Sequence, residues 1–369
     1  MEIKLNNETI KAINILESHG YLAYVVGGYI RDLILNVEPH DVDLLTDATL
    51  EEVRFIFSDY KIVDYKKNSL TLGVIIDGRY LEISTFDGKN LEEDLANRDF
   101  TINAIAYSKT DGIIDPYGGI NDINDKIIKT INDPIISLCK SPIRIIRAIY
   151  FSIIKEFKID KELKDVILTR TDLLSNINPA RYKKFLDVVM LSKKPSLIIE
   201  EYFEVFCYIF PHLKNTYKFN QNSKFHNLDV FEHTMKVLDF SSPNLILRYA
   251  AFFHDIEKPS CYKIDEFNDV HYYNHNILSA EYSSIKLKEF NYSKEFILRV
   301  YNLVLYHDII LDKNPIILKK FLNDFGTYDL DLFFELKKCN ILGQNQILYN
   351  RLNELDEIKE LTLNLSKDK

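Results

Sequence analysis

The segment from Val25 to Thr46, VVGGYIRDLILNVEPHDVDLLT, places a glycine pair between two apolar runs and ends in alternating aspartates. Residues 21–27 predict a buried strand, the next eight residues predict a short helix, and residues 41–46 predict a second strand. Residues two apart in a strand project from the same face, about 7 Å apart. Asp41 and Asp43 would therefore present two carboxylates side by side.

This arrangement suits a divalent cation and a triphosphate. Mg²⁺ prefers carboxylate oxygens together with phosphate oxygens, and two-metal sites activate an attacking hydroxyl and stabilise a leaving pyrophosphate. Gly27 and Gly28 lie between the strand and the helix, where backbone without Cβ atoms can approach phosphate oxygens. Arg31, one turn into the helix, is placed to pair with the same triphosphate. Each feature alone is commonly structural, but their combination favours nucleotide transfer.

The flanking sequence predicts a mixed sheet followed by helices. Residues 8–19 have a helical apolar face, and Thr49 is a helix cap. Residues 70–76 and 80–85 flank the turn pair Asp77-Gly78 and predict a β-hairpin. From about Pro134 onward nearly every segment has helical periodicity. We therefore predict an α+β fold, with a mixed-sheet amino-terminal domain and an all-helical remainder.

Composition limits the classes of function. The 369 residues are 46% apolar but contain no long apolar run and no leader, so we expect a cytoplasmic protein with no membrane partner. Four dispersed cysteines argue against a zinc cage or disulfide framework. The net charge of −9 disfavours nucleic acid, yet residues 131–194 contain 13 Lys or Arg against 7 Asp or Glu. A basic belt that binds RNA is compatible with this distribution.

Four segments, in order, resemble motifs of the bacterial CCA-adding tRNA nucleotidyltransferase and poly(A) polymerase family. Residues 27–46 are similar to its GGxVRDxLLG and DxDhxT motifs, where h is apolar. Residues 91–107, LEEDLANRDFTINAIAY, resemble LEEDLxRRDFTINAMAY, and residues 113–123, IIDPYGGINDI, resemble DPFGGxxDI. Residues 141–151, SPIRIIRAIYF, resemble the family's EDxxRxxRAxRF helix, which reads the nucleotide base.

Six of the nine histidines lie in four segments, FHNLDVFEHTMKVL, LRYAAFFHDIEKP, HYYNHN and LVLYHD. The His254-Asp255 pair ends an apolar helix, where an unpaired charge is costly, so a metal or hydrogen-bonding partner is expected. The order His, His-Asp, His, His resembles the HD superfamily of metal-dependent phosphohydrolases. That resemblance implies a divalent transition metal bound by or near His233, His254, Asp255, His275 and His307. Histidines that only pack a helical body are the alternative.

Together these resemblances imply a polymerase-β-like nucleotidyltransferase domain in residues 1–129, a helical neck for base recognition and RNA binding in 130–194, and a helical body in 195–369 with an HD domain at about 225–310. They imply Mg²⁺-dependent addition of nucleotides from CTP and ATP to the 3′ end of tRNA. The implied catalytic carboxylates are Asp41 and Asp43, which would bind Mg²⁺. Glu82, on the strand beside them, is a candidate third carboxylate. The implied nucleotide-binding residues are Gly27, Gly28, Arg31, Arg98, Asp99, Asn103, Arg144 and Arg147.

Departures from the family pattern bear on base choice. Lys140 and Ser141 replace a Glu and an Asp, while Asn97 and Tyr150 replace arginines. A serine is a shorter and weaker acceptor than a carboxylate for the exocyclic amino groups of C and A. About 20 residues of a loop found in relatives are also missing after residue 87. Three alternatives therefore stay open: a paralogue with altered base choice, such as a poly(A)- or single-nucleotide-adding enzyme; an HD phosphohydrolase whose amino-terminal domain only binds nucleotide; and a non-catalytic RNA-binding protein.

Overall fold

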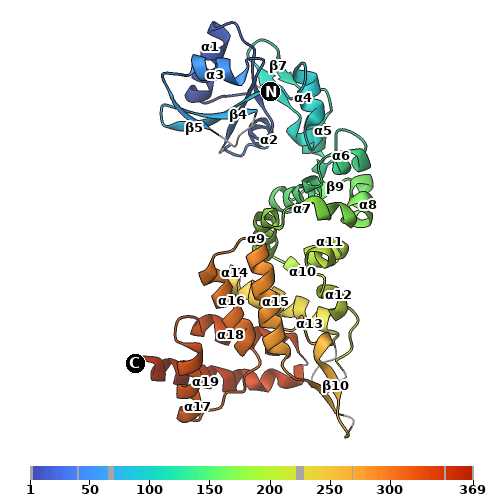
Figure 1. The fold of residues 1–369 in the computed structure, drawn as a ribbon, viewed down its shortest axis with the longest axis vertical. Coiled ribbons are helices and arrows are strands. Elements are labelled where there is room, and N and C mark those ends of the chain that lie inside the picture. The colour runs from blue at the N-terminus through green and yellow to red at the C-terminus, as the bar shows by residue number, and fades with distance from the viewer. Residues whose placement is uncertain are drawn as a thin grey trace. The chain divides into compact units, whose positions relative to one another are not determined.

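The computed structural model describes residues 3–39, 41–64, 70–221, 228–267, 269–344 and 346–367. The chain divides into two compact units, residues 1–167 and 168–369 (Figure 1). This boundary lies inside the segment 130–194 that we predicted as a neck. The first unit therefore contains the sheet together with the first neck helices.

A seven-stranded mixed sheet forms the centre of the first unit, in the order β3-β4-β5-β2-β1-β6-β7. β2 and β5 are parallel, whereas the other neighbouring pairs are antiparallel. The predicted strands around the glycine pair and the predicted hairpin at Asp77-Gly78 are confirmed. The strands are β1 (Ala23–Val26), β2 (Val42–Thr46), β3 (Lys61–Asp64), β4 (Thr71–Ile76), β5 (Arg79–Thr85), β6 (Ala106–Ser108) and β7 (Gly112–Ile114).

Helices flank this sheet, and local sequence signals explain where several of them begin. The Asn6 side chain caps α1, and Thr49 with Glu52 forms a capping box that starts α3, as predicted. α2 packs against β1 and α5, which fixes the segment after the glycine pair. The helices are α1 (Asn7–Ser18), α2 (Gly28–Ile34), α3 (Leu50–Ile56), α4 (Leu91–Asn97), α5 (Gly119–Asn124), α6 (Pro134–Lys140), α7 (Ile143–Lys155) and α8 (Lys161–Thr169), with the 3₁₀ turn η1 (Thr101–Asn103).

The second unit is predominantly helical, with a core rich in buried phenylalanines such as Phe206, Phe252 and Phe333. Its α-helices are α9 (Lys183–Leu191), α10 (Pro195–Glu201), α11 (Phe203–Ile209), α12 (Leu213–Thr216), α13 (Val230–Phe240), α14 (Leu245–Phe253), α15 (His275–Glu289), α16 (Lys294–Tyr306), α17 (Pro315–Phe325), α18 (Leu330–Gly343) and α19 (Arg351–Lys367). The 3₁₀ turns are η2 (Thr171–Asn176), η3 (Pro179–Tyr182), η4 (Pro259–Cys261) and η5 (Gln346–Asn350).

Short strands interrupt the region predicted as all-helical, and one of them pairs with a strand just before that region. β8 (Ile127–Ile128) pairs in parallel with β9 (Lys158–Ile159), and β10 (Tyr262–Ile264) pairs with β11 (Val270–Tyr272). Strands of two or three residues are too short to show the alternation on which strand prediction rests. Within the described ranges, no helix combines the length and apolar content needed to cross a membrane.

Candidate nucleotide site and metal centre

Carboxylates gather where β2 and β5 run side by side. The register places Asp43 directly opposite Glu82, so both side chains lie on one face of the sheet. Asp41 is exposed and lies one residue before β2 rather than within it, which corrects our predicted strand start. Burial, then repulsion from Glu82 and from Asp41, raise the pKa of Asp43 to about 6, although Arg98 and Arg31 oppose this effect. This crowding of negative charge is relieved when a cation binds.

Gly27 brings the backbone close to this carboxylate group. Its φ of 69° lies in the left-handed region, and a Cβ here would lie 2.8 Å from Arg98 Nη1 and 3.8 Å from Asp43 Oδ2. The Gly27 amide donates to the Ile105 carbonyl at 3.0 Å. The glycine therefore lets the backbone approach closely, while its amide already donates a hydrogen bond within the fold.

A continuous network joins the candidate nucleotide-binding residues. Arg31 donates through Nε and Nη2 to Asp32 at 2.9 and 3.1 Å, and through Nη1 to Asn103 Oδ1. Asn103 Nδ2 donates to Asp99 Oδ1 at 2.9 Å, and Asp99 Oδ2 accepts from Arg147 Nε at 2.7 Å. Because Arg147 lies on α7 and Arg31 on α2, the network connects two helices more than 100 residues apart in sequence.

Two further arginines lie at the carboxyl end of α4. Arg98 pairs with Asp94 at 3.1 Å, one turn earlier in the helix. Arg144 is buried and donates to the Asn97 carbonyl and to Ser137 Oγ, both at 2.6 Å. Burial lowers the pKa of Arg144, although Asp99 opposes this effect. Arg144 thus ties α7 to the end of α4, the segment that leads directly into Arg98.

The departures from the family pattern are neighbours in space. Lys140 Nζ donates to Asn97 Oδ1 at 2.7 Å, so two of the replaced positions contact each other. Asn97 Nδ2 in turn donates to the Asp87 carbonyl at 2.6 Å. A hydrogen bond between an ammonium and an amide therefore stands at positions where the family pattern has an acid and an arginine.

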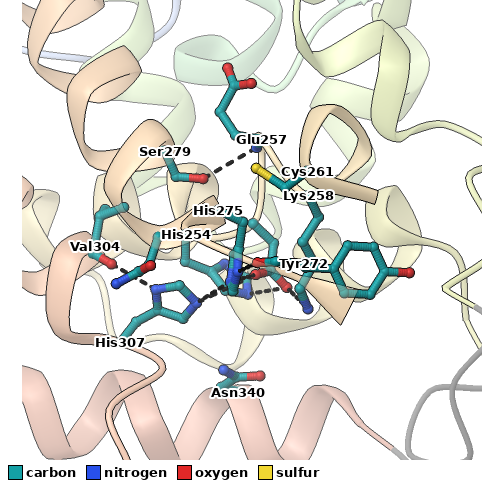
Figure 2. A network of polar contacts seen from close by, with 12 residues as sticks. His254, Glu257, Lys258, Cys261, Tyr272, His275, Ser279, Val304, His307 and Asn340 are labelled. Carbon is teal, nitrogen blue, oxygen red and sulfur yellow. Dashed lines mark hydrogen bonds and ion pairs between the residues drawn. The ribbon is translucent and has the colours of Figure 1, made fainter. Parts of the chain in front are cut away.

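In the second unit, the five residues of the predicted metal site come together, and all of them are buried. His233 and His254 face Asp255 Oδ2 at 3.6 and 3.2 Å, while His275 and His307 face Oδ1 at 3.3 and 3.4 Å. Two possible three-ligand groups therefore share one carboxylate, and Figure 2 shows His254, His275 and His307 converging. Metal–ligand bonds of about 2.1 Å place neighbouring ligand atoms about 3.0–3.4 Å apart, close to these spacings.

Backbone carbonyls orient the four imidazoles. The Nδ1 atoms face carbonyl oxygens in the pairs His233 with Gly343 (3.2 Å), His254 with Ala251 (2.7 Å), His275 with Tyr272 (2.8 Å) and His307 with Val304 (2.6 Å). A carbonyl only accepts, so Nδ1 carries the proton of each neutral ring and Nε2 presents a lone pair. The Nε2 atoms of His233 and His254 are 3.2 Å apart, and those of His275 and His307 are 3.3 Å apart.

The carboxylate of Asp255 lies at the centre of this arrangement. Among the described residues, neither oxygen of Asp255 accepts a hydrogen bond, although Lys258 Nζ forms an ion pair with Oδ2 at 2.7 Å. Burial raises the pKa of Asp255, but the facing His254 and the charge of Lys258 outweigh it and hold that pKa well below its usual value. Burial also lowers the pKa of His307, which favours the neutral ring that a metal requires. The donor set fits a transition metal.

Comparison with known proteins identifies the amino-terminal part. Residues 23–129 match the model of the poly(A) polymerase head domain. This part of the chain, called the head domain below, is similar to that domain. The head domain thus includes the sheet strands and the carboxylates described above, and α6 and α7 follow it in the chain.

Individual relatives extend the comparison. The chain spans about half the length of the curated relatives it matches. The CCA-adding enzyme of Geobacillus sp. (strain WCH70) is 36% identical over 208 residues, which is 51% of each chain. The CC-adding tRNA nucleotidyltransferase of Halalkalibacterium halodurans is 33% identical over 182 residues, 49% of this chain and 48% of its own.

Solved structures share the fold beyond the head domain. The Bacillus stearothermophilus CCA-adding enzyme in complex with CTP aligns with a TM-score of 0.65 at 22% identity, over 95% of this chain and 81% of its own. The Thermotoga maritima CCA-adding enzyme complexed with tRNA aligns with a TM-score of 0.61 at 19% identity, over 98% and 82%. The chain therefore has the fold of these enzymes.

Sequence reasoning missed several residues that support the sites. Asp32 and Lys155 complete the environment of Arg31 in the head domain, and Phe151 contacts its guanidinium. Phe151 and Lys155 are spaced i, i+4 on α7, and this spacing was an available signal. It does not reveal which helix the two residues contact. Gly343 was also missed: a Cβ there would lie 3.1 Å from His233 Nδ1, so only glycine lets α18 approach.

The raised pKa of Asp43 predicts how binding of a divalent cation at these carboxylates would depend on pH. Below about pH 6 the carboxyl group is protonated and cannot bind a cation, so affinity should rise about tenfold per pH unit up to that point and then level off. Calorimetric titration with Mg²⁺ and a triphosphate between about pH 5 and 8 measures this. The Glu82→Gln variant removes the largest repulsion, so its midpoint should move to lower pH. A midpoint unchanged or higher in Glu82→Gln contradicts the argument.

Proposed function

We propose that the chain is a Mg²⁺-dependent nucleotidyltransferase that extends the 3′ end of RNA, with tRNA as substrate and CTP and ATP as donors. One observation carries the proposal: Asp43 faces Glu82 across parallel strands, with the Arg98 guanidinium beside Gly27 at the same place. This is a carboxylate pair next to a cation that can pair with phosphate. The head-domain match, the names of the curated relatives and the shared fold support the reaction class.

The side chains have distinct proposed roles. Asp41 and Asp43 would bind Mg²⁺, and Glu82 is the third carboxylate of the group. When bound, Mg²⁺ supplies activation of the attacking 3′ hydroxyl and neutralises charge on the α-phosphate. Arg31 and Arg98 would bind the remaining phosphate oxygens, since paired guanidiniums suit that charge. Asp99 and Asn103 would orient the ribose, and Arg144 and Arg147 would contact the base.

Base choice is the part of this proposal that the departures affect most. Ser141 replaces a carboxylate, so we expect incorporation of C and A with weaker discrimination against the other bases. The Ser141→Asp variant should raise discrimination for C and A about tenfold, because hydrogen bonds to a charged acceptor contribute about 1.5–3 kcal/mol. Radiolabelled incorporation with each triphosphate measures this, with Ser58→Asp, at an exposed turn of the head domain, as the matched control. Strict C, C, A addition by the natural chain contradicts the relaxed selection.

We also propose a second function for the second unit, a metal centre built from the five buried residues around Asp255. Two observations favour it over histidines that only pack a core: the Asp255 oxygens accept no hydrogen bond from the described residues, and four Nε2 lone pairs point inward. A divalent transition metal at this place supplies an activated water for attack on a phosphoester. Lys258, with its side chain 11% exposed beside Asp255, is the candidate contact for the phosphate. This arrangement is the basis for keeping the HD phosphohydrolase assignment as a proposal.

A further inference from the structure

One stripe of α7 contacts the head domain at three successive turns. Arg147, Phe151 and Lys155 are spaced i, i+4 and i+8, so they share a face of the helix. Arg147 Nε binds Asp99 Oδ2 at 2.7 Å, and Lys155 Nζ binds Asp32 Oδ1 at the same distance. The stripe therefore meets the nucleotide network at both of its ends.

Phe151 lies between these two ion pairs and contacts two guanidiniums. The Arg31 Cζ lies 5.1 Å from the centre of its ring, and the Arg147 Cζ lies 5.3 Å from it. Phe100 meets the same ring edge-on at 6.0 Å, which fixes the ring from the head-domain side. A cation over an aromatic face is stabilised most where water is excluded, and the Arg31 side chain is only 8% exposed.

Lys155 acts on Arg31 through a shared carboxylate. Asp32 accepts from Arg31 Nε and Nη2 and from Lys155 Nζ, and its side chain is 17% exposed. Burial raises the pKa of Asp32, but the hydrogen bonds from Arg31 and Lys155 outweigh that effect and lower it. Because the Asp32 carboxylate is held between two cations, it restrains the orientation of the Arg31 guanidinium. The guanidinium lies beside Gly28, where a Cβ would lie 3.5 Å from Arg31 Nη2.

We propose that Phe151 and Lys155 are positioning residues that orient Arg31 toward the triphosphate of the incoming nucleotide. The inference rests on the proposed function, in which Arg31 binds phosphate. It assigns to α7 a role distinct from base contact: neither residue reaches the nucleotide, and both act through the Arg31 guanidinium. The phosphate-binding half of the site is then complete only when α7 is docked on α2.

The test separates orientation of Arg31 from simple loss of stability. Phe151→Leu keeps most of the side-chain volume but removes the π face, and Lys155→Met keeps the stem but removes the charge. Each should raise the KM for the triphosphate about tenfold with a smaller change in kcat, because a misoriented Arg31 weakens binding of the triphosphate in ground state and transition state alike. Phe151→Tyr and Lys155→Arg, which retain ring and charge, should restore the KM.

Binding without RNA supplies the second readout. ATP, ADP and AMP are titrated into each folded variant, with Phe55→Leu and Lys161→Met, at exposed positions, as controls. The ratio of ATP to AMP affinity should shrink about tenfold in Phe151→Leu and Lys155→Met and stay unchanged in the controls. If the natural chain binds ATP and extends RNA while this ratio is unchanged in both variants, the positioning role is overturned. If the natural chain itself neither binds ATP nor extends RNA, the proposed function fails instead.

Discussion

Replacing Asp43 with asparagine is expected to lower the rate of nucleotide addition at least about a thousandfold, because loss of a carboxylate that binds the activating cation removes several kcal/mol of transition-state stabilisation. Asp43 lies at the centre of the site. Glu82 faces it from the neighbouring strand β5, and Asp41, Arg98 and Arg31 all shift its pKa. Single-turnover extension of a labelled RNA at saturating Mg²⁺ measures the loss directly.

The same variant should fold at least as stably as the natural chain without metal. The pKa of Asp43 is raised in the folded protein to about 6, so near pH 7 its ionised form opposes folding, and this cost appears as pH rises from about 4 to 6. A neutral asparagine removes the repulsion from Glu82. Thermal unfolding in a chelator should therefore give an equal or higher Tm for Asp43→Asn. Asp59→Asn, at an exposed carboxylate of the same domain, should change neither the rate of nucleotide addition nor the Tm. Extension that persists in folded Asp43→Asn contradicts the role.

The second large effect concerns the metal centre. Purified protein should contain a tightly bound divalent transition metal. Asp255→Asn should remove it, because an amide lacks the anionic oxygens that face the two histidine pairs. Chelation should lower the Tm of the natural chain by about 10 °C, because binding at a hundred- to thousandfold above Kd contributes about 3–4 kcal/mol to a domain of this size. Asp255→Asn should show no response to the chelator.

Asp265→Asn is the matched control for that variant. Asp265 pairs with His271 at 2.8 Å on the β10–β11 hairpin, outside the cluster, so its loss should leave the metal content unchanged. Metal content by mass spectrometry and hydrolysis of a phosphodiester after metal is restored are measured together. Equal metal content in Asp255→Asn and the natural chain contradicts the metal centre. If the natural chain contains the metal but does not hydrolyse the phosphodiester, the metal has a structural role and the proposed hydrolase activity is overturned.

Local patterns predicted most of the fold, because each depends on neighbours in sequence. The glycine pair, the Thr49 cap and the Asp77-Gly78 turn each specify their own backbone, and all three appear as predicted. β10 and β11 were missed because three-residue strands carry too little alternation to be detected. Asp41 was placed inside β2 because element boundaries follow from pairing, which one strand does not reveal.

The sites were predictable in residue type but not in geometry. A sequence motif selected Asp43, and Glu82 was a candidate on the hairpin strand, yet their direct opposition depends on the register between strands nearly 40 residues apart. The histidine segments likewise predicted residues that cluster in space, whereas the division of one Asp255 carboxylate between two imidazole pairs depends on how α13 meets the ends of α14, α15 and α16. The α7 stripe shows the same limit, since Phe151 could be placed on a helix face but not against Arg31.

Sequencing of the 3′ ends produced on a tRNA transcript that lacks its terminal nucleotides tests the central claim most directly. With Mg²⁺, CTP and ATP, the natural chain should add C and A residues to the transcript, and the Asp43→Asn variant should leave its end unextended. Unextended transcripts from the natural chain, or equal extension by Asp43→Asn, would contradict nucleotidyl transfer at the Asp43 and Glu82 site.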